Sequence, residues 1–135
     1  MRVHLPTALR ARILAAAGQA AQVEVCGLLV GRIHDDVWID DVVMAENVAA
    51  TPQKRFEIDP QLQFDTMRKL RGGEHVIVGH FHSHPDGPAE PSTQDLAMAI
   101  DPKAIWVIAA LKPQPKIAAF ICRDQGQGFQ ELEVI

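Results

Sequence analysis

Two histidines and an aspartate stand close together in the sequence, in an order that favours the binding of one metal ion. His82 and His84 are two positions apart, and the apolar run 76–81 before them predicts a buried strand. Side chains two apart on a strand point to the same face, so both imidazoles can reach one cation. Asp95 follows eleven residues after His84, beyond a loop rich in proline and glycine that can fold back. Two imidazoles and one carboxylate leave a fourth tetrahedral position open for water, which is the arrangement of a hydrolytic zinc site.

Strand alternation does not by itself choose the ligands. His80 lies on the same predicted face as His82 and His84, so a site of three histidines is also geometrically conceivable. Ser92 and Asp95 have a competing structural explanation, because Ser-x-x-Asp after a proline is close to a capping box at a helix N-terminus. The two roles are partly compatible, since a cap can hold the same two residues in place beside a metal.

The order His-x-His, seven residues, Ser, two residues, Asp resembles the signature of the JAMM (MPN-plus) metallopeptidases. Upstream, the segment 24–31 is similar to the strand that carries the catalytic glutamate of that family. The segment 56–60 resembles one found in its small, stand-alone bacterial members. The resemblance implies one Zn²⁺ per chain, held by His82, His84 and Asp95. It leaves His80 in the wall of the site or beside a ligand.

The same resemblance implies that Glu24 is the general base and that Ser92 donates a hydrogen bond to the oxyanion formed during attack. From the sequence alone, a lone acid at the edge of the predicted strand 23–33 is usually a strand-end charge that faces water. Asp86 and Glu90 lie much nearer to the histidines in the sequence, but neither matches a position of the family.

The activity implied by the resemblance is that of a zinc-dependent hydrolase of amide or isopeptide bonds. Its substrate class is a ubiquitin-like or sulfur-carrier protein, cleaved after the C-terminal Gly-Gly. Two alternatives are a peptidase acting on small or peptidoglycan-derived peptides and a non-catalytic scaffold of the same fold. The scaffold is disfavoured, because such domains usually lose ligands that this chain keeps. The resemblance leaves room for a homodimer, on which the sequence is silent.

Length and composition fit one globular domain over residues 1–135. The net charge of −4 and the lack of any cluster of Lys and Arg argue against nucleic acid as a partner. No apolar stretch approaches the length of a membrane span, which argues against a membrane protein. Cys26 and Cys122 are isolated and no export signal precedes them, so we expect reduced thiols and a cytoplasmic protein. Cys26 is expected to be a small buried hydrophobe.

Apolar spacing predicts helices over 6–20 and 60–70, the second with Leu62, Phe64, Met67 and Leu70 on its apolar side and ending at Gly72-Gly73. A short helix is expected over 93–100. Apolar runs predict strands over 23–33, 37–46, 56–58, 76–82, 104–111, 116–122 and 129–134. This order is typical of the α/β (α+β) class, with a mixed β-sheet flanked by helices. The resemblance implies the JAMM/MPN fold, which is cytidine-deaminase-like.

A substrate with a Gly-Gly tail needs a groove beside the metal. We expect the loop 85–91 to form one wall and the segment 47–58 the other, where Lys54 and Arg55 could meet an acidic carrier surface.

Overall fold

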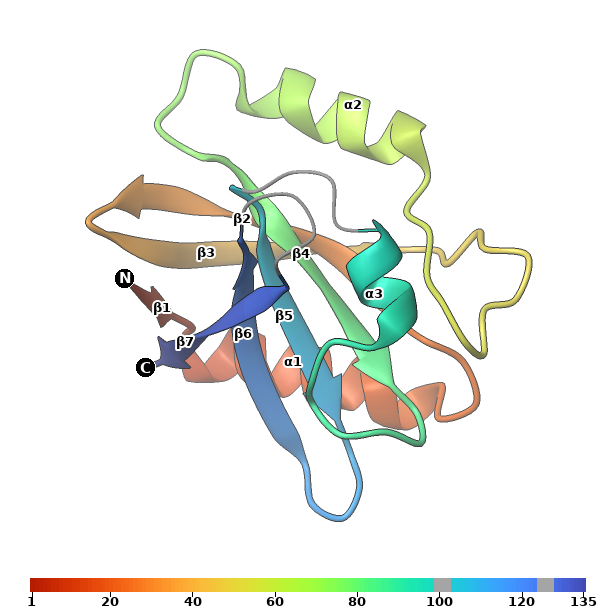
Figure 1. The fold of residues 1–135 in the computed structure, drawn as a ribbon. Helices are drawn as coiled ribbons and strands as arrows, with labels where there is room; N and C mark the ends of the chain where they lie inside the picture. The colour runs from red at the N-terminus through yellow and green to blue at the C-terminus, as the bar shows by residue number, and fades with distance from the viewer. Residues whose placement is uncertain (99–102, 124–127) are drawn as a thin grey trace.

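A sheet of seven strands closes on itself as a barrel in the computed structural model, which describes residues 1–98, 103–123 and 128–135 (Figure 1). The strands are β1 (Arg2–His4), β2 (Cys26–His34), β3 (Asp36–Ala45), β4 (Val76–His84), β5 (Ile105–Ala110), β6 (Lys116–Cys122) and β7 (Phe129–Val134). Their order around the barrel is β1-β3-β2-β4-β5-β6-β7. Strand β1 runs parallel to β3 and β7, and β4 runs parallel to β5, whereas the other neighbours are antiparallel. The predicted mixed sheet is confirmed. Its closure into a barrel was not predicted from the sequence.

The closure depends on β1, which the sequence did not predict because three residues are too short to show a period. The backbone of this strand pairs with both β3 and β7. The Leu5 N–H donates to the Ile135 carbonyl at 2.9 Å, so the two termini lie side by side (Figure 1). Asp36 accepts hydrogen bonds from the Arg2 backbone N–H at 2.9 Å and from His4 Nε2 at 2.8 Å. These contacts fasten the N-terminus to the start of β3.

Helix α1 (Thr7–Gln19) covers one face of the sheet, and its buried Leu9 and Ile13 join a core that includes Leu29 and Phe81. A second apolar cluster lies on the opposite face, around Trp106 and Ile108. Helices α2 (Pro60–Leu70) and α3 (Thr93–Met98) lie outside the first core (Figure 1). The predicted helices are confirmed within a few residues, and positions 99–100 of the third fall outside the described residues. None of the described helices is long and apolar enough to cross a bilayer.

For the segment 56–70, the expected strand is wrong and the expected apolar side of the helix is only partly buried. The run 56–58 forms only an isolated bridge between Asn47 and Ile58 instead of a strand. In α2 the one buried residue is Thr66, and Leu62 of the predicted apolar side is partly buried against the second apolar cluster. Phe64 and Met67 of that side are 56% and 60% exposed, so they do not pack on the core. A local signal also supports the helix, because Asp59 caps its first turn by accepting from the Gln61 N–H at 2.9 Å.

Strand β4 contains an irregularity that decides which of its side chains face the site. Leu29 of β2 pairs with Gly79, but the next residue of β2 pairs with Ile77, so Val78 is an extra residue in β4. Gly79 permits this close packing, since a Cβ there would lie 1.9 Å from the Ile105 carbonyl oxygen. Beyond this bulge the alternation is regular. Phe81 therefore points into the core beneath α1, and the neighbouring histidines point to the other face.

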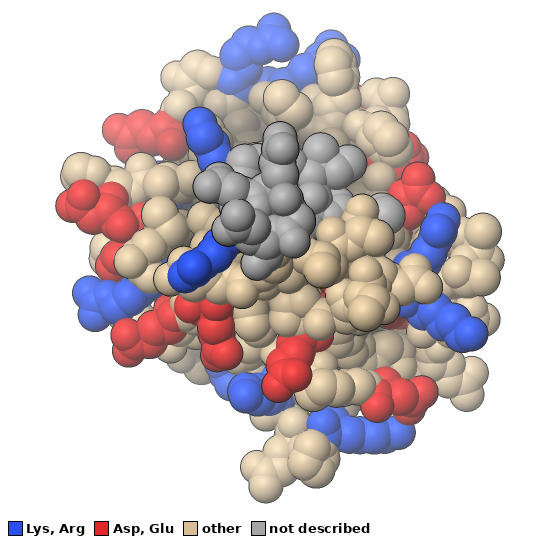
Figure 2. All heavy atoms as spheres, viewed as in Figure 1, with Lys and Arg blue, Asp and Glu red and all other residues tan. Residues whose placement is uncertain are grey.

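Charged side chains of both signs are interspersed over the face of the molecule shown in Figure 2. This distribution agrees with the small negative net charge of the sequence.

Replacing Gly79 by alanine should destabilise the fold strongly, because the new methyl group would force β4 away from β5. We expect a loss of about 3 kcal/mol in the free energy of unfolding, at the upper end of the cost of overpacking. Denaturant unfolding measures it. Gly18→Ala is the matched control, because Gly18 is an exposed residue of α1 with no atom within 4 Å of an added Cβ. That change should be neutral or stabilise by up to about 1 kcal/mol. Equal stabilities of the two variants would contradict the close approach of β4 to β5 at Gly79.

Candidate metal centre

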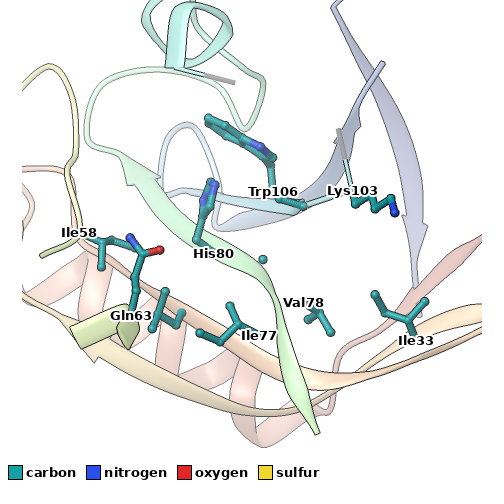
Figure 3. A pocket seen from close by; sticks show the side chains of 11 residues that line it. Ile33, Ile58, Gln63, Ile77, Val78, His80, Lys103 and Trp106 are labelled. Atoms are coloured by element: carbon teal, nitrogen blue, oxygen red, sulfur yellow. The ribbon is translucent and has the colours of Figure 1, made fainter. Parts of the chain in front are cut away.

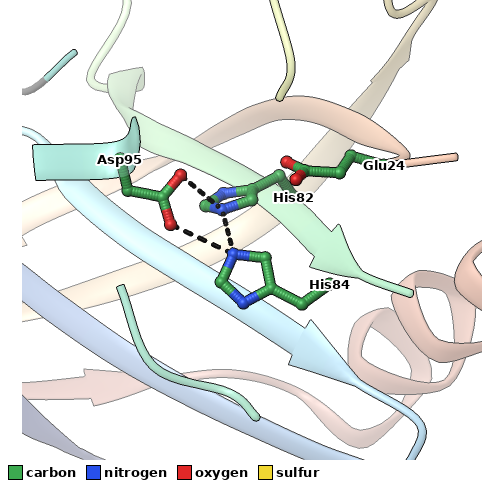
Figure 4. Close-up of side chains that lie close together, drawn as sticks. All are labelled: Glu24, His82, His84 and Asp95. Carbon is green, nitrogen blue, oxygen red and sulfur yellow. Dashed lines mark hydrogen bonds and ion pairs between the residues drawn. The ribbon is translucent and has the colours of Figure 1, made fainter. Parts of the chain in front are cut away.

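Four side chains from distant parts of the sequence meet beside the carboxyl end of β4 (Figure 4). Nε2 of His82 lies 3.1 Å from Nε2 of His84. Asp95 faces both imidazoles, with Oδ1 3.1 Å from His82 Nε2 and Oδ2 3.0 Å from His84 Nε2. Glu24 adds a second carboxylate, and the ligand atoms of all four residues lie within 4.8 Å of one another. The structure thus brings together the three expected ligands and the expected base, all of them buried.

Asp95 is placed by the first turn of α3 through a reciprocal cap. Ser92 Oγ accepts a hydrogen bond from the Asp95 N–H at 3.0 Å, and Asp95 Oδ2 accepts one from the Ser92 N–H at 2.8 Å. This is the capping-box pattern with Asp in place of Glu. The structural role suggested by Ser-x-x-Asp and the position of Asp95 beside the histidines therefore occur together. Ser92 Oγ accepts in this cap, so its O–H proton stays free to donate elsewhere.

The orientation of His84 is set by a backbone carbonyl. Its Nδ1 lies 2.9 Å from the Pro88 carbonyl oxygen, and a carbonyl can only accept, so the proton is on Nδ1. Nε2 is then the atom left to coordinate a metal, and without a metal it donates a hydrogen bond to Asp95 Oδ2 at 3.0 Å. Burial lowers the pKa of His84, but hydrogen bonds to Asp95 and to the Pro88 carbonyl outweigh it and hold the pKa above its usual value.

The remaining charges of the centre follow from burial and from shared hydrogen bonds. Burial lowers the pKa of His82, so this imidazole is neutral and keeps a lone pair. Burial alone would raise the pKa of Asp95, but hydrogen bonds to His82, His84 and the Ser92 amide hold it well below its usual range. Asp95 is therefore an anion inside the protein, with donors on both oxygens.

The donor set fits a zinc ion. Ligand atoms around tetrahedral zinc, each at about 2.0–2.1 Å from the metal, are about 3.3 Å apart. The nitrogens and carboxylate oxygens of His82, His84 and Asp95 stand 3.0–3.1 Å apart, close to that spacing. Glu24 Oε1 is buried and has no hydrogen-bond partner among the described residues. Two imidazoles, a carboxylate and an unpartnered acid next to them are the groups that a hydrolytic zinc site uses.

Glu24 does not belong to the strand in which the sequence placed it, since β2 begins only at Cys26. Its backbone N–H donates to the Pro52 carbonyl at 2.7 Å, and its own carbonyl accepts from Asn47 Nδ2 at 2.8 Å. Sequence reasoning missed these supports, which join segments more than twenty residues apart and have no local signal. Burial, with a smaller contribution from Asp95, raises the pKa of the Glu24 carboxyl to about 7. Such a group exchanges protons readily near neutral pH.

A cleft of about 460 Å³ opens onto these residues. Its lining includes Glu24, His84 and Ser92, most of the loop 85–91, and Gln53 with Lys54. Residues of both segments expected as walls therefore line this cleft, and they include Lys54 but not Arg55. Asp86 and Glu90 also line the cleft but lie outside the cluster of metal-ligating atoms found among the described residues.

His80 stands apart from the three ligand atoms and lines a neighbouring pocket of about 420 Å³ along β4 (Figure 3). Its ring lies 4.3 Å from that of Trp106 and 5.2 Å from that of Phe56, centroid to centroid. Burial lowers its pKa to about 3, so the ring is neutral. Cys26 is buried, as expected, and burial together with Glu24 raises the pKa of its thiol to about 11. A thiolate nucleophile is not available at that position.

Comparison with known proteins agrees with this geometry. Residues 6–122 match the family described as prokaryotic homologues of the JAB domain. A curated desampylase of Haloferax volcanii is 31% identical over 82% of this chain and 76% of its own length. A protein of Desulfitobacterium hafniense, solved in solution, is 35% identical with a TM-score of 0.86, covering 98% of this chain and 91% of that one. A JAB1/MPN domain protein of Archaeoglobus fulgidus, 20% identical, shares the fold with a TM-score of 0.62 over 100% and 99% of the two chains.

The chain belongs to the family of prokaryotic JAB-domain homologues. It has the α/β fold of that family and is a JAMM-type isopeptidase.

The centre should bind one zinc ion per chain after reconstitution, as measured by elemental analysis of the dialysed protein. His82→Ala and His84→Ala each remove a neutral nitrogen donor and should abolish stoichiometric binding. His80→Ala is the matched control: it removes a histidine of the same strand and face and should leave the zinc content unchanged. Loss of the metal from His80→Ala, with retention in His82→Ala, would show a different set of ligands.

Proposed function

We propose that the protein is a zinc-dependent isopeptidase that hydrolyses the bond after the C-terminal Gly-Gly of a ubiquitin-like or sulfur-carrier protein. The main observation in support is that the Glu24 carboxyl, whose pKa is raised to about 7, lies beside two imidazoles and a second carboxylate. In this proposal His82, His84 and Asp95 hold the metal, Glu24 is the general base and Ser92 assists the oxyanion. Two free, buried cysteines support a cytoplasmic location.

When bound, zinc lowers the pKa of a coordinated water toward about 7 and polarises the scissile carbonyl. Glu24 takes the proton from the attacking water, because its carboxylate lies beside the ligand atoms and is ionised at and above about neutral pH. The same carboxyl then gives the proton to the leaving amine. The Pro88 carbonyl and the cap of α3 keep His84 and Asp95 in place meanwhile, so these ligands need no reorganisation during the reaction.

The role proposed for Ser92 at the oxyanion is supported by two observations: the residue lines the cleft, and its hydroxyl proton is not used in the cap of α3. A preorganised donor of this kind contributes a few kcal/mol to the transition state. The nucleophile is water rather than a side chain of the protein, since the raised pKa of Cys26 keeps that thiol protonated.

The shape of the cleft supports a narrow, extended substrate. Residues of the loop 85–91 and the pair Gln53-Lys54 line the same cleft as Glu24 and His84. A tail of glycines offers little besides its backbone, and it can pass along such a cleft without side chains that collide. The Haloferax volcanii relative is named a desampylase, an enzyme that removes a ubiquitin-like modifier, and this supports a protein substrate over a small or peptidoglycan-derived peptide. The complete cluster, with Glu24, disfavours a non-catalytic scaffold.

Glu24→Gln should bind zinc normally and lose about a hundredfold or more in turnover, because the amide cannot accept a proton from water. The substrate is a carrier protein ending in Gly-Gly and joined to a lysine, and the measurements are kcat and zinc content. Glu90→Gln is the matched control, a change of the same kind in the same cleft, and should stay active. Ser92→Ala should lose less turnover than Glu24→Gln, together with about 1 kcal/mol of stability from the weakened cap. A fully active Glu24→Gln would remove this base from the mechanism.

Lys54→Glu should raise KM for an acidic carrier conjugate several-fold, because a like charge then meets the substrate at the rim of the cleft. The effect on a short Gly-Gly amide, which does not reach the rim, should be much smaller. Lys69→Glu on the exposed side of α2 makes the same change of net charge away from the cleft and should leave both values near those of the wild type. Equal KM values for the two variants on the carrier would place the carrier elsewhere.

A further inference from the structure

The side chain of Asn47 makes more hydrogen bonds than a surface loop residue requires. Its Nδ2 donates to the Glu24 carbonyl at 2.8 Å and to the Arg55 carbonyl at 3.0 Å. Its Oδ1 accepts from the Ala49 N–H at 3.0 Å and from the Glu57 N–H at 3.1 Å. Carbonyls only accept and amides only donate, so this orientation of the carboxamide is the one that satisfies all four partners.

These bonds join Glu24 to the cleft wall. Ala49, Arg55 and Glu57 belong to the segment 47–58, and Pro52 of the same segment accepts the Glu24 N–H at 2.7 Å. Both backbone polar groups of Glu24 are therefore bonded to this segment, the N–H to the Pro52 carbonyl and the carbonyl to the Asn47 side chain. Neither group is bonded within a strand. The segment has little regular structure of its own beyond the bridge at Asn47 and Ile58. Asn47 supplies the contacts that a sheet would otherwise provide.

The residue after Glu24 is held in a different way. Val25 N–H donates to Ser83 Oγ at 2.9 Å, and the Val25 carbonyl accepts the Ser83 N–H at 2.9 Å. Ser83 stands between the two metal-site histidines on β4. Glu24 thus lies at a junction, with the barrel fixing the chain on its C-terminal side and the loop fixing the residue itself.

We propose that Asn47 is the positioning residue for Glu24. Its hydrogen bonds keep the Glu24 carboxyl close enough to the metal-ligating atoms to act as a base. This inference rests on the proposed function of Glu24. Alanine at position 47 leaves the Glu24 carbonyl and the loop amides without their partner, so the carboxylate is no longer held in one place. A misplacement of about 1 Å costs up to about a hundredfold in rate.

A double-mutant cycle tests the inference. Asn47→Ala should lower kcat on a Gly-Gly amide about ten- to a hundredfold with one zinc still bound per chain. In the Glu24→Gln background the same change should cost less than about threefold, because the residue it positions has already lost its function. An equal loss in both backgrounds overturns the proposal, as a general structural effect would produce it. Thr66→Ala, which removes a partly buried hydrogen bond within α2, is the control for destabilisation and should leave kcat unchanged.

Hydrogen exchange of the metal-free protein tests the contacts independently of activity. In Asn47→Ala the amides of Ala49 and Glu57 lose their acceptor, and the amide of Glu24 loses a fixed acceptor because Pro52 belongs to the same segment. All three should exchange about tenfold faster or more, while Val25, bonded to Ser83, should stay protected. Unchanged exchange at Glu24 overturns the proposal. If the alanine variant does not fold, Asn47→Asp has nearly the same shape, keeps the acceptor oxygen and loses the donors, and it takes its place in the cycle. A wild-type enzyme without turnover would contradict the proposed function, and exchange would still decide whether Asn47 holds Glu24.

Discussion

The carboxylate of Asp95 is the group on which the geometry of the centre depends. It is buried and ionised, which is costly unless donors surround it. Its two oxygens face Nε2 of His82 and of His84, and one of them also accepts from the backbone N–H of Ser92. One side chain thus ties β4 to the first turn of α3. The same arrangement directs both imidazole nitrogens toward a common point, so the fold brings the donor atoms together before a cation is bound.

The strand that presents the imidazoles is constrained by the core on one face and by its neighbours in the sheet. Phe81 fills the core beneath α1. The extra residue at Val78 sets which face of the sheet each later side chain of β4 points to. Gly79 allows β5 to approach so closely that a side chain would collide with it. The positions of His82 and His84 therefore derive from packing on the far side of the sheet. Rigid donors of this kind need little reorganisation when a metal binds or a substrate reacts.

The sequence predicted what depends on local pattern, and it missed what depends on contacts between distant segments. The spacing of His82 and His84 shows that both face one side of a strand, and apolar periodicity located most strands and helices. The three residues of β1 are too few to carry a period, yet they close the barrel. The apolar positions of α2 followed a helical period, but Leu62 packs on the core whereas Phe64 and Met67 are exposed, because the period says nothing of what the helix packs against. Only the family resemblance pointed to Glu24, whose supports come from the segment 47–58.

A carboxylate within 4.8 Å of three ligand atoms has two chemical options beside a cation. It can coordinate the ion as a fourth ligand, which closes the site, or stand back and exchange protons with a bound water. Side-chain chemistry does not separate these options, since Asp95 and Glu24 carry the same group. The difference lies in how each is held. Asp95 accepts donors on both oxygens, whereas Glu24 Oε1 is left unpartnered and its residue is fixed through the backbone. A carboxyl without a strong donor also keeps its pKa raised by burial, and that is the property a base needs near neutral pH.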